Sequence, residues 1–211
     1  MRVIAIDGPA GAGKSTVARA LAARLGLEYL DTGAMYRAVT FAAMQRGIDP
    51  AEVDRVAKLA QEIRLVVDEH GVKVDGIDAT AQIRSAEVTA AVSTVAANSA
   101  VRAELVRRQR KWANQRDGGV LEGRDIGSVV FPDAELKLYL TAAPTVRAER
   151  RVAESGGDLG EIEAAIARRD SSDRSRTDGP LLEAEGAVVV DTTGLSIDEV
   201  LERIEQLLER E

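Results

Sequence analysis

The segment that most constrains the fold of this chain is the glycine-rich run at residues 8–15, GPAGAGKS. It fits the pattern G-x-x-x-x-G-K-[ST]. A short run rich in β-branched residues precedes it at 3–6, and a helical pattern of apolar residues follows it at 14–25. A glycine-rich turn between a strand and a helix directs backbone N–H groups and the positive end of the helix at one point, where phosphate oxygens bind. The run therefore predicts a phosphate-binding loop.

The predicted site for a nucleoside triphosphate consists of nine consecutive residues: Gly8, Pro9, Ala10, Gly11, Ala12, Gly13, Lys14, Ser15 and Thr16. We expect Lys14 to reach the β- and γ-phosphates of ATP and the Ser15 hydroxyl to ligate Mg²⁺. The loop identifies the phosphoryl donor, but by itself it leaves the reaction open.

Strand patterns alternate with helical patterns along the chain. The predicted strands of the main sheet are 3–6, 27–30, 120–122, 136–140 and 187–190, and the predicted helices are 14–25, 33–45, 53–62, 85–97, 101–115, 161–169 and 196–208. This alternation favours an α/β fold with a parallel five-stranded sheet.

Two regions interrupt the alternation. Residues 64–67 and 72–74 read as strands joined by a turn at 68–71, which predicts a small antiparallel hairpin inserted in the chain. The stretch 155–180 is polar, and we interpret it as a lid, with a mobile part at 171–179.

Composition excludes several classes of protein. The 211 residues carry a formal net charge of −7 and no cysteine. The acidic balance argues against binding nucleic acid through a basic surface, and the lack of cysteine excludes a disulfide framework. No apolar run approaches the roughly 18 residues of a membrane-spanning helix, and the N-terminus becomes acidic too early for an export signal. We therefore expect a cytoplasmic protein without membrane partners and, since no heptad pattern is present, a monomer.

The sequence lacks the motifs of some classes of P-loop protein, and this reduces the number of possible classes. The D-x-x-G pattern at 191–194 follows the last predicted strand, and neither Asn98 nor Asn114 begins an N-K-x-D motif, which disfavours a GTPase. We interpret 191–194 as a loop near the adenine. The only histidine, His70, is predicted to be a solvated turn residue. A kinase whose acceptor is a phosphate monoester fits better, because that acceptor is already largely ionised, with a second pKa of about 6, and needs no general base.

Such a reaction requires positioning and neutralisation of charge. The chain has 23 arginines against 5 lysines, and arginine binds phosphate oxygens bidentately. Codon use that favours arginine would give the same excess. The run Arg107, Arg108 and Arg110 is interpreted as a solvated helix face.

Four motifs in order along the chain resemble bacterial cytidylate kinases, which are P-loop nucleoside monophosphate kinases. They are IDGPAGAGKS at 6–15, LDTGAMYR at 30–37, GRDIG with VVFPD within 123–133, and RRDSSDRSR at 168–176. The resemblance implies a three-layer P-loop NTPase fold and transfer of the γ-phosphoryl group of ATP to CMP or dCMP. It also implies a core (1–50, 91–145 and 180–211), a monophosphate-binding insert at about 51–90 and a helical lid at about 146–179.

The resemblance also implies a role for individual residues. Thr32 lies near the base, Arg102 contacts the cytosine edge, and Asp125 accepts from the cytosine amino group. Asp173 and Arg169 hold the ribose. The acceptor phosphate is gripped by Arg37, Arg124 and Arg176. Arg150 reaches the transferred phosphoryl group, and with Lys14 and Arg124 it makes up the expected catalytic set. Arg84 matches an arginine of the insert.

Two questions stay open at this point. Glu122, at the end of a predicted strand, either orients Mg²⁺ through water or pairs with Arg124. The chain as a whole is a CMP kinase, a kinase of another small acceptor, or a nucleotide-binding regulatory module without turnover.

Overall fold

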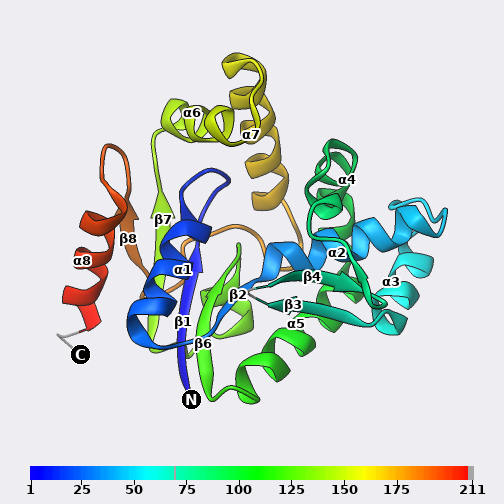
Figure 1. Cartoon of the computed structure of the whole chain (residues 1–211), viewed down its shortest axis with the longest axis horizontal. Helices are drawn as coiled ribbons and strands as arrows, with labels where there is room; N and C mark the ends of the chain where they lie inside the picture. Colours follow the sequence, from blue (N-terminus) through cyan, green and yellow to red (C-terminus); the bar gives the residue numbers. More distant parts are fainter. Residues whose placement is uncertain (69, 209–211) are drawn as a thin grey trace.

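The computed structural model describes residues 1–68 and 70–208 (Figure 1). Its main sheet consists of β1 (Arg2–Asp7), β2 (Tyr29–Asp31), β6 (Gly118–Glu122), β7 (Leu136–Thr141) and β8 (Val188–Asp191). The strand order is β2-β6-β1-β7-β8, and every neighbouring pair is parallel. The predicted five-stranded parallel sheet is confirmed.

Helices cover both faces of this sheet and produce three layers. The helices are α1 (Lys14–Leu25), α2 (Thr32–Gln45), α3 (Val53–Glu62), α4 (Ala86–Ala96), α5 (Ser99–Asn114), α6 (Pro144–Ser155), α7 (Leu159–Arg174) and α8 (Ile197–Leu208). β1 sends Ile4 and Ile6 into a core shared with α1 and α8, and it sends Val3 and Ala5 into a second core shared with α2. Successive side chains of a strand point to opposite faces, so a buried central strand supplies both cores. Within the described residues, no helix is long and apolar enough to cross a membrane.

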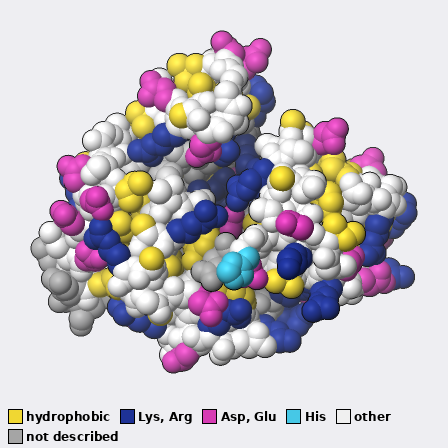
Figure 2. Space-filling view, viewed as in Figure 1, with side chains coloured by type: hydrophobic (Ala, Val, Ile, Leu, Met, Phe, Trp, Pro, Cys, Tyr) yellow, Lys and Arg dark blue, Asp and Glu magenta, His cyan; other side chains and the backbone are white. Residues whose placement is uncertain are grey.

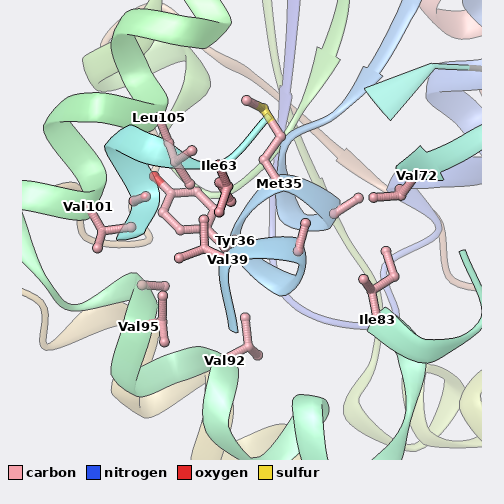
Figure 3. Packing of buried hydrophobic residues seen from close by; sticks show 14 of the residues in the cluster. Met35, Tyr36, Val39, Ile63, Val72, Ile83, Val92, Val95, Val101 and Leu105 are labelled. Atoms are coloured by element: carbon pink, nitrogen blue, oxygen red, sulfur yellow. The ribbon is translucent and has the colours of Figure 1, made fainter. Parts of the chain in front are cut away.

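The insert contains three strands where the sequence predicted two. β3 (Leu65–Asp68) and β4 (Gly71–Val74) form the predicted antiparallel hairpin, and β5 (Ile77–Asp78) pairs with the other edge of β4. Of the predicted turn at 68–71, Glu69 lies outside the described residues. The third strand was missed because two residues carry no readable alternation. The insert packs on α2, and Val72 and Ile83 belong to the same hydrophobic cluster as Met35 and Val39 of that helix (Figure 3).

The predicted mobile segment at 171–179 is partly wrong, because α7 continues to Arg174. Asp170 and Asp173 are both 1% exposed, and each is paired with an arginine from elsewhere in the chain. These buried ion pairs fix the last turn of the helix, and local composition does not reveal them.

The basic run on α5 agrees only in part with the solvated face that the sequence predicted: Arg107 and Arg110 are exposed, whereas Arg108 is half-buried. The Arg108 Nη2 donates to the Ala60 carbonyl at 2.7 Å and the Arg110 Nε donates to the Val130 carbonyl at 3.0 Å. The ends of helices leave carbonyl groups without intrahelical partners. Arg108 satisfies such groups at the end of α3, and Arg110 satisfies them at the end of a π-helical turn, η2 (Ile126–Val130).

Candidate active site

A cleft of about 1380 Å³ opens at the carboxyl ends of the central strands, between the P-loop, the insert and the helices α6 and α7. Figure 2 shows lysine and arginine side chains gathered around this hollow. The cleft is lined by residues 10–16 of the P-loop and by all the predicted acceptor-site residues: Thr32, Arg37, Arg102, Arg124, Asp125, Arg169, Asp173 and Arg176. Gly8 and Pro9 lie outside its lining, and His70 is exposed at its border. The structure thus brings together residues as far apart in the sequence as Ala12 and Thr192, which are 180 positions apart.

The P-loop leads directly into α1, which begins at Lys14 after Gly13 has taken a left-handed conformation, with φ of 87°. The Lys14 Nζ donates to the Pro9 carbonyl at 2.7 Å and is buried. Burial, and then the charge of Arg124, lower the pKa of Lys14 to about 7, although Glu122 opposes this shift. In this structure the Lys14 ammonium group therefore binds a carbonyl of its own loop. Nearby negative charge does not offset the cost of burying it.

Glu122 ends β6 beside Ser15, and its Oε1 accepts a hydrogen bond from the Tyr29 hydroxyl. Burial raises the pKa of Glu122, and the nearby Asp31 adds to the shift, whereas Lys14 and a hydrogen bond from Ser15 lower it. Arg124, the alternative partner, pairs with Asp173 instead. Ser15 and Glu122 offer the hydroxyl and carboxylate oxygens that Mg²⁺ prefers. Among the described residues, no group of three or more His, Cys, Asp or Glu side chains forms a ready-made metal site.

At the insert end of the cleft, Arg102 of α5 and Asp125 form a buried ion pair. The Arg102 guanidinium also lies over the Tyr36 ring, 5.7 Å from its centroid. Burial raises the pKa of Asp125, and Arg102 opposes the shift. The loop that carries Asp125 is held by Asp7, which accepts from the backbone N–H groups of Ile126 at 2.8 Å and Gly127 at 2.7 Å.

Gly179 closes over the Arg102–Asp125 pair. Its φ is +59°, and a Cβ built there would overlap the Arg102 Nη2 and the Asp125 Oδ2. We expect Gly179→Ala to break the pair and to lower the free energy of unfolding by about 2–4 kcal/mol, measured by urea denaturation. The matched control is Gly186→Ala, where φ is +73° and the nearest atoms are 3.8 Å away. That variant should lose only the backbone penalty of about 1 kcal/mol, and equal losses in both variants would contradict this account.

In the middle of the cleft, arginines outnumber the carboxylates that could neutralise them. The Arg124 Nε donates to the Asp173 Oδ2 at 2.7 Å, and Arg176 pairs with the other oxygen of the same carboxylate. Burial, and then Arg124 and Arg37, lower the pKa of Arg169 to about 9. Burial, and then Arg84, lower the pKa of Arg37 to about 10. The buried Nε atoms of Arg169 and Arg176 have no hydrogen-bond partner among the described residues. This arrangement is that of a site for an anion.

The remaining predicted residues border this centre. The Thr32 hydroxyl donates to the Glu122 carbonyl at 2.6 Å, and the Arg84 Nη2 lies 3.2 Å from the Asp31 Oδ2. Arg150 donates to the Thr192 hydroxyl at 3.0 Å, and Thr192 in turn donates to the carbonyl of Ala12 in the P-loop. The 191–194 loop therefore lies beside the P-loop, on the donor side of the cleft.

Sequence reasoning missed several residues of the site. Asp7, Tyr29 and Gly179 act on other site residues through contacts over long sequence separations, and only Asp7 had a local indication, as a carboxylate between a strand and the P-loop. Arg151 also lines the cleft, next to the predicted Arg150.

Comparisons with known proteins agree with this geometry. The family model described as cytidylate kinase matches residues 4–210. The chain is 46% identical to a cytidylate kinase of Corynebacterium efficiens, over 98% of this chain and 94% of that protein. It is 50% identical to a bifunctional pantoate ligase/cytidylate kinase of Synechococcus sp. strain RCC307, over 96% of this chain but only 41% of that protein. The chain thus spans less than half the length of such bifunctional relatives.

Solved structures with low sequence identity to this chain share its fold, and the comparison with them shows nothing beyond the fold. A gluconokinase from Sinorhizobium meliloti 1021 superposes with a TM-score of 0.56 at 15% sequence identity, covering 99% of this chain and 92% of that one. The family match, in contrast, covers nearly the whole chain and includes all four motifs from which the resemblance was drawn. The chain belongs to the cytidylate kinase family.

Proposed function

We propose that this chain transfers the γ-phosphoryl group of ATP to CMP or dCMP, giving ADP with CDP or dCDP. The observation that carries the proposal is the arginine cluster of the cleft, which lies between the P-loop and the Arg102–Asp125 pair. A monophosphate placed there has its phosphate among Arg37, Arg124 and Arg176 and its base toward Asp125. Family membership supports cytosine as that base.

The chemistry requires charge neutralisation more than acid–base catalysis. The oxygens of the acceptor phosphate are largely ionised at neutral pH, so they attack without transferring a proton to the enzyme. The groups that offset the charge on the transferred phosphoryl group are Lys14, Arg124 and Arg150. We assign the ribose to Arg169 and Asp173, and Thr32 to the vicinity of the base. We assign Arg102 to the cytosine edge, where it also pairs with Asp125 and opposes the rise that burial produces in the pKa of that carboxyl.

Magnesium belongs to this proposal as a companion of ATP. When bound, Mg²⁺ would neutralise part of the charge of the ATP phosphates. Ser15 and Glu122 are the residues that would hold it, the second through water. Tyr29 fixes the carboxylate of Glu122 for that purpose.

The broader assignments follow from the same features. We propose a division into a core (1–50, 91–145 and 180–211), an insert (51–90) and a lid (146–179), which the separate three-stranded sheet and the α6–α7 pair support. The net charge of −7 supports a protein that acts on small nucleotides without nucleic-acid partners. Cytoplasmic location, a role in pyrimidine nucleotide metabolism and a monomeric state complete the proposal.

A turnover assay separates this function from a regulatory module. ADP release is measured with ATP and Mg²⁺ alone, and then with CMP added. A kinase of CMP releases ADP at a substantial rate only when CMP is present, and the CDP formed equals the ADP released. Equal slow release with and without CMP would support a module without CMP turnover.

The lowered pKa of Lys14, about 7 in the free protein, gives ATP binding a pH dependence. Because the phosphates of ATP favour the ammonium form, they raise the pKa of Lys14 in the complex. At pH 8 most Lys14 in the free protein is neutral, so binding should take up close to one proton. Between pH 7 and the pKa in the complex, the affinity should then fall by about tenfold per pH unit.

Calorimetric titration of ATP in buffers of different ionisation enthalpy measures this uptake. Lys14→Arg is the matched control, because arginine stays protonated throughout this range. When ATP binds, the Lys14→Arg variant should take up about one proton fewer than the unmodified protein does. Equal proton uptake in both proteins would contradict the assignment of the titrating group to Lys14.

A further inference from the structure

The lid helices hold the P-loop through a buried ion pair that the roles above do not use. Arg147 of α6 and Asp170 of α7 are paired, and they are 8% and 1% exposed. The Asp170 Oδ1 accepts from the backbone N–H of Ala10 at 3.0 Å, and the Arg147 Nη1 donates to the carbonyl of Ala10 at 3.0 Å. Both polar groups of one P-loop residue are thus bound by the two helices of the lid.

Apolar and steric contacts reinforce this attachment. Ala10, Ala148 and Ile166 form a hydrophobic cluster separate from the two main cores, with Ile162 against it. A Cβ at Gly11 would lie 2.8 Å from the Arg147 carbonyl, so the loop and α6 approach as closely as glycine permits. In Figure 1 the loop between β1 and α1 points toward α6 and α7.

A second pair repeats the pattern one helical turn further along α7. The Arg124 Nη1 donates to the carbonyl of Gly8 at 2.9 Å, and the carboxylate partner of Arg124 is Asp173, three residues after Asp170. Residues three apart on a helix share a face. Two carbonyls of the P-loop are therefore bound by arginines whose partners lie on the same face of α7.

From these contacts we infer that Arg147 and Asp170 are positioning residues that hold the P-loop in its phosphate-binding conformation. The inference rests on the proposed function for the identity of the donor, ATP. A loop with several glycines has many conformations in the absence of such restraints. Charge-assisted hydrogen bonds to the Ala10 peptide select one of them before ATP arrives, and this lowers the ordering that binding must supply.

The test compares binding of ATP with binding of CMP in Asp170→Asn and Arg147→Lys. Asp170→Asn keeps an acceptor for the Ala10 N–H but removes the negative charge. Arg147→Lys keeps the positive charge but removes the planar guanidinium, which can donate to Ala10 and to Asp170 at the same time. Binding is measured by calorimetry with Mg²⁺ and a non-hydrolysable ATP analogue, and separately with CMP. We expect the Kd for the ATP analogue to rise by about tenfold or more in each variant, and the Kd for CMP to change by less than about twofold. The double variant should lose little more than either single variant, because the two side chains act as a unit.

The matched control is Arg108→Lys, which alters another arginine that donates to backbone carbonyls, but outside the cleft. It should lower the melting temperature without changing the Kd for the ATP analogue. Variants that melt cooperatively and bind the analogue as tightly as the unmodified protein would overturn the inference. An equal rise in the Kd for the ATP analogue and in the Kd for CMP would also overturn it, because it would show that the substitution disturbs the whole protein. Failure of the unmodified protein to bind the analogue would instead contradict the proposed function.

Discussion

Replacement of Asp125 by alanine should lower kcat/KM for CMP by about 100-fold and reduce the preference for CMP over UMP to within a few-fold. The carboxylate of Asp125 is the acceptor that we assign to the amino group of cytosine, and uracil has a carbonyl in that place. The Kd for ATP should change little, because the ion-pair partner of Asp125 is Arg102 of α5 and not a residue of the P-loop. Steady-state kinetics with CMP and UMP, together with calorimetry of ATP, measure both effects.

Stability has to be followed in the same experiment. Asp125→Ala leaves the buried Arg102 without its carboxylate, and uncompensated buried charges cost about 3–5 kcal/mol. Asp125→Asn keeps the shape of the side chain and provides a second variant if the first does not fold. A fall in ATP binding as large as the fall in CMP turnover would show that Asp125 is wrongly placed in this account.

Replacement of Lys14 by alanine should lower kcat by about 100- to 1,000-fold while CMP still binds. The ammonium group is the charge that the P-loop brings to the β- and γ-phosphates, where negative charge must be offset during transfer. In this structure it is held by the carbonyl of Pro9 at 2.7 Å, within its own loop, and ATP would replace that contact.

Single-turnover kinetics with saturating CMP separate this effect on the chemical step from any effect on product release. The Kd for CMP provides the internal control, because Lys14 lies on the donor side. A variant with kcat within a few-fold of the unmodified value would remove Lys14 from the catalytic set. Arg124 and Arg150 would then have to supply the neutralisation that we assign to Lys14.

The sequence predicted the P-loop and the parallel sheet because both depend on local patterns. The run at 8–15 has its own conformational requirements, and a buried strand such as 3–6 needs only apolar side chains. The antiparallel insert was also readable, from one polar turn between two alternating runs. The third strand of that insert, β5, is too short to carry such a pattern.

What the sequence did not reveal depends on contacts between distant residues. The last turn of α7 looked like a polar loop because its stability comes from Arg124 and Arg147, which belong to other parts of the chain. Arg110 is exposed, as the sequence predicted, but it and the half-buried Arg108 also donate to carbonyls of the π-helical turn and of α3, and those contacts between distant residues leave no local pattern. The resemblance to a family placed most candidate residues in one cleft, but it did not indicate that Gly179 covers the Arg102–Asp125 pair.

A panel of acceptors shows whether the acceptor is a cytidine monophosphate. ADP release is measured with ATP, Mg²⁺ and, in turn, CMP, dCMP, UMP, AMP and dTMP, and kcat/KM is compared across the panel. CMP and dCMP should have the highest values, by at least about tenfold over every other acceptor. Equal or faster turnover of AMP or UMP would contradict the assignment of a cytidine monophosphate as the acceptor.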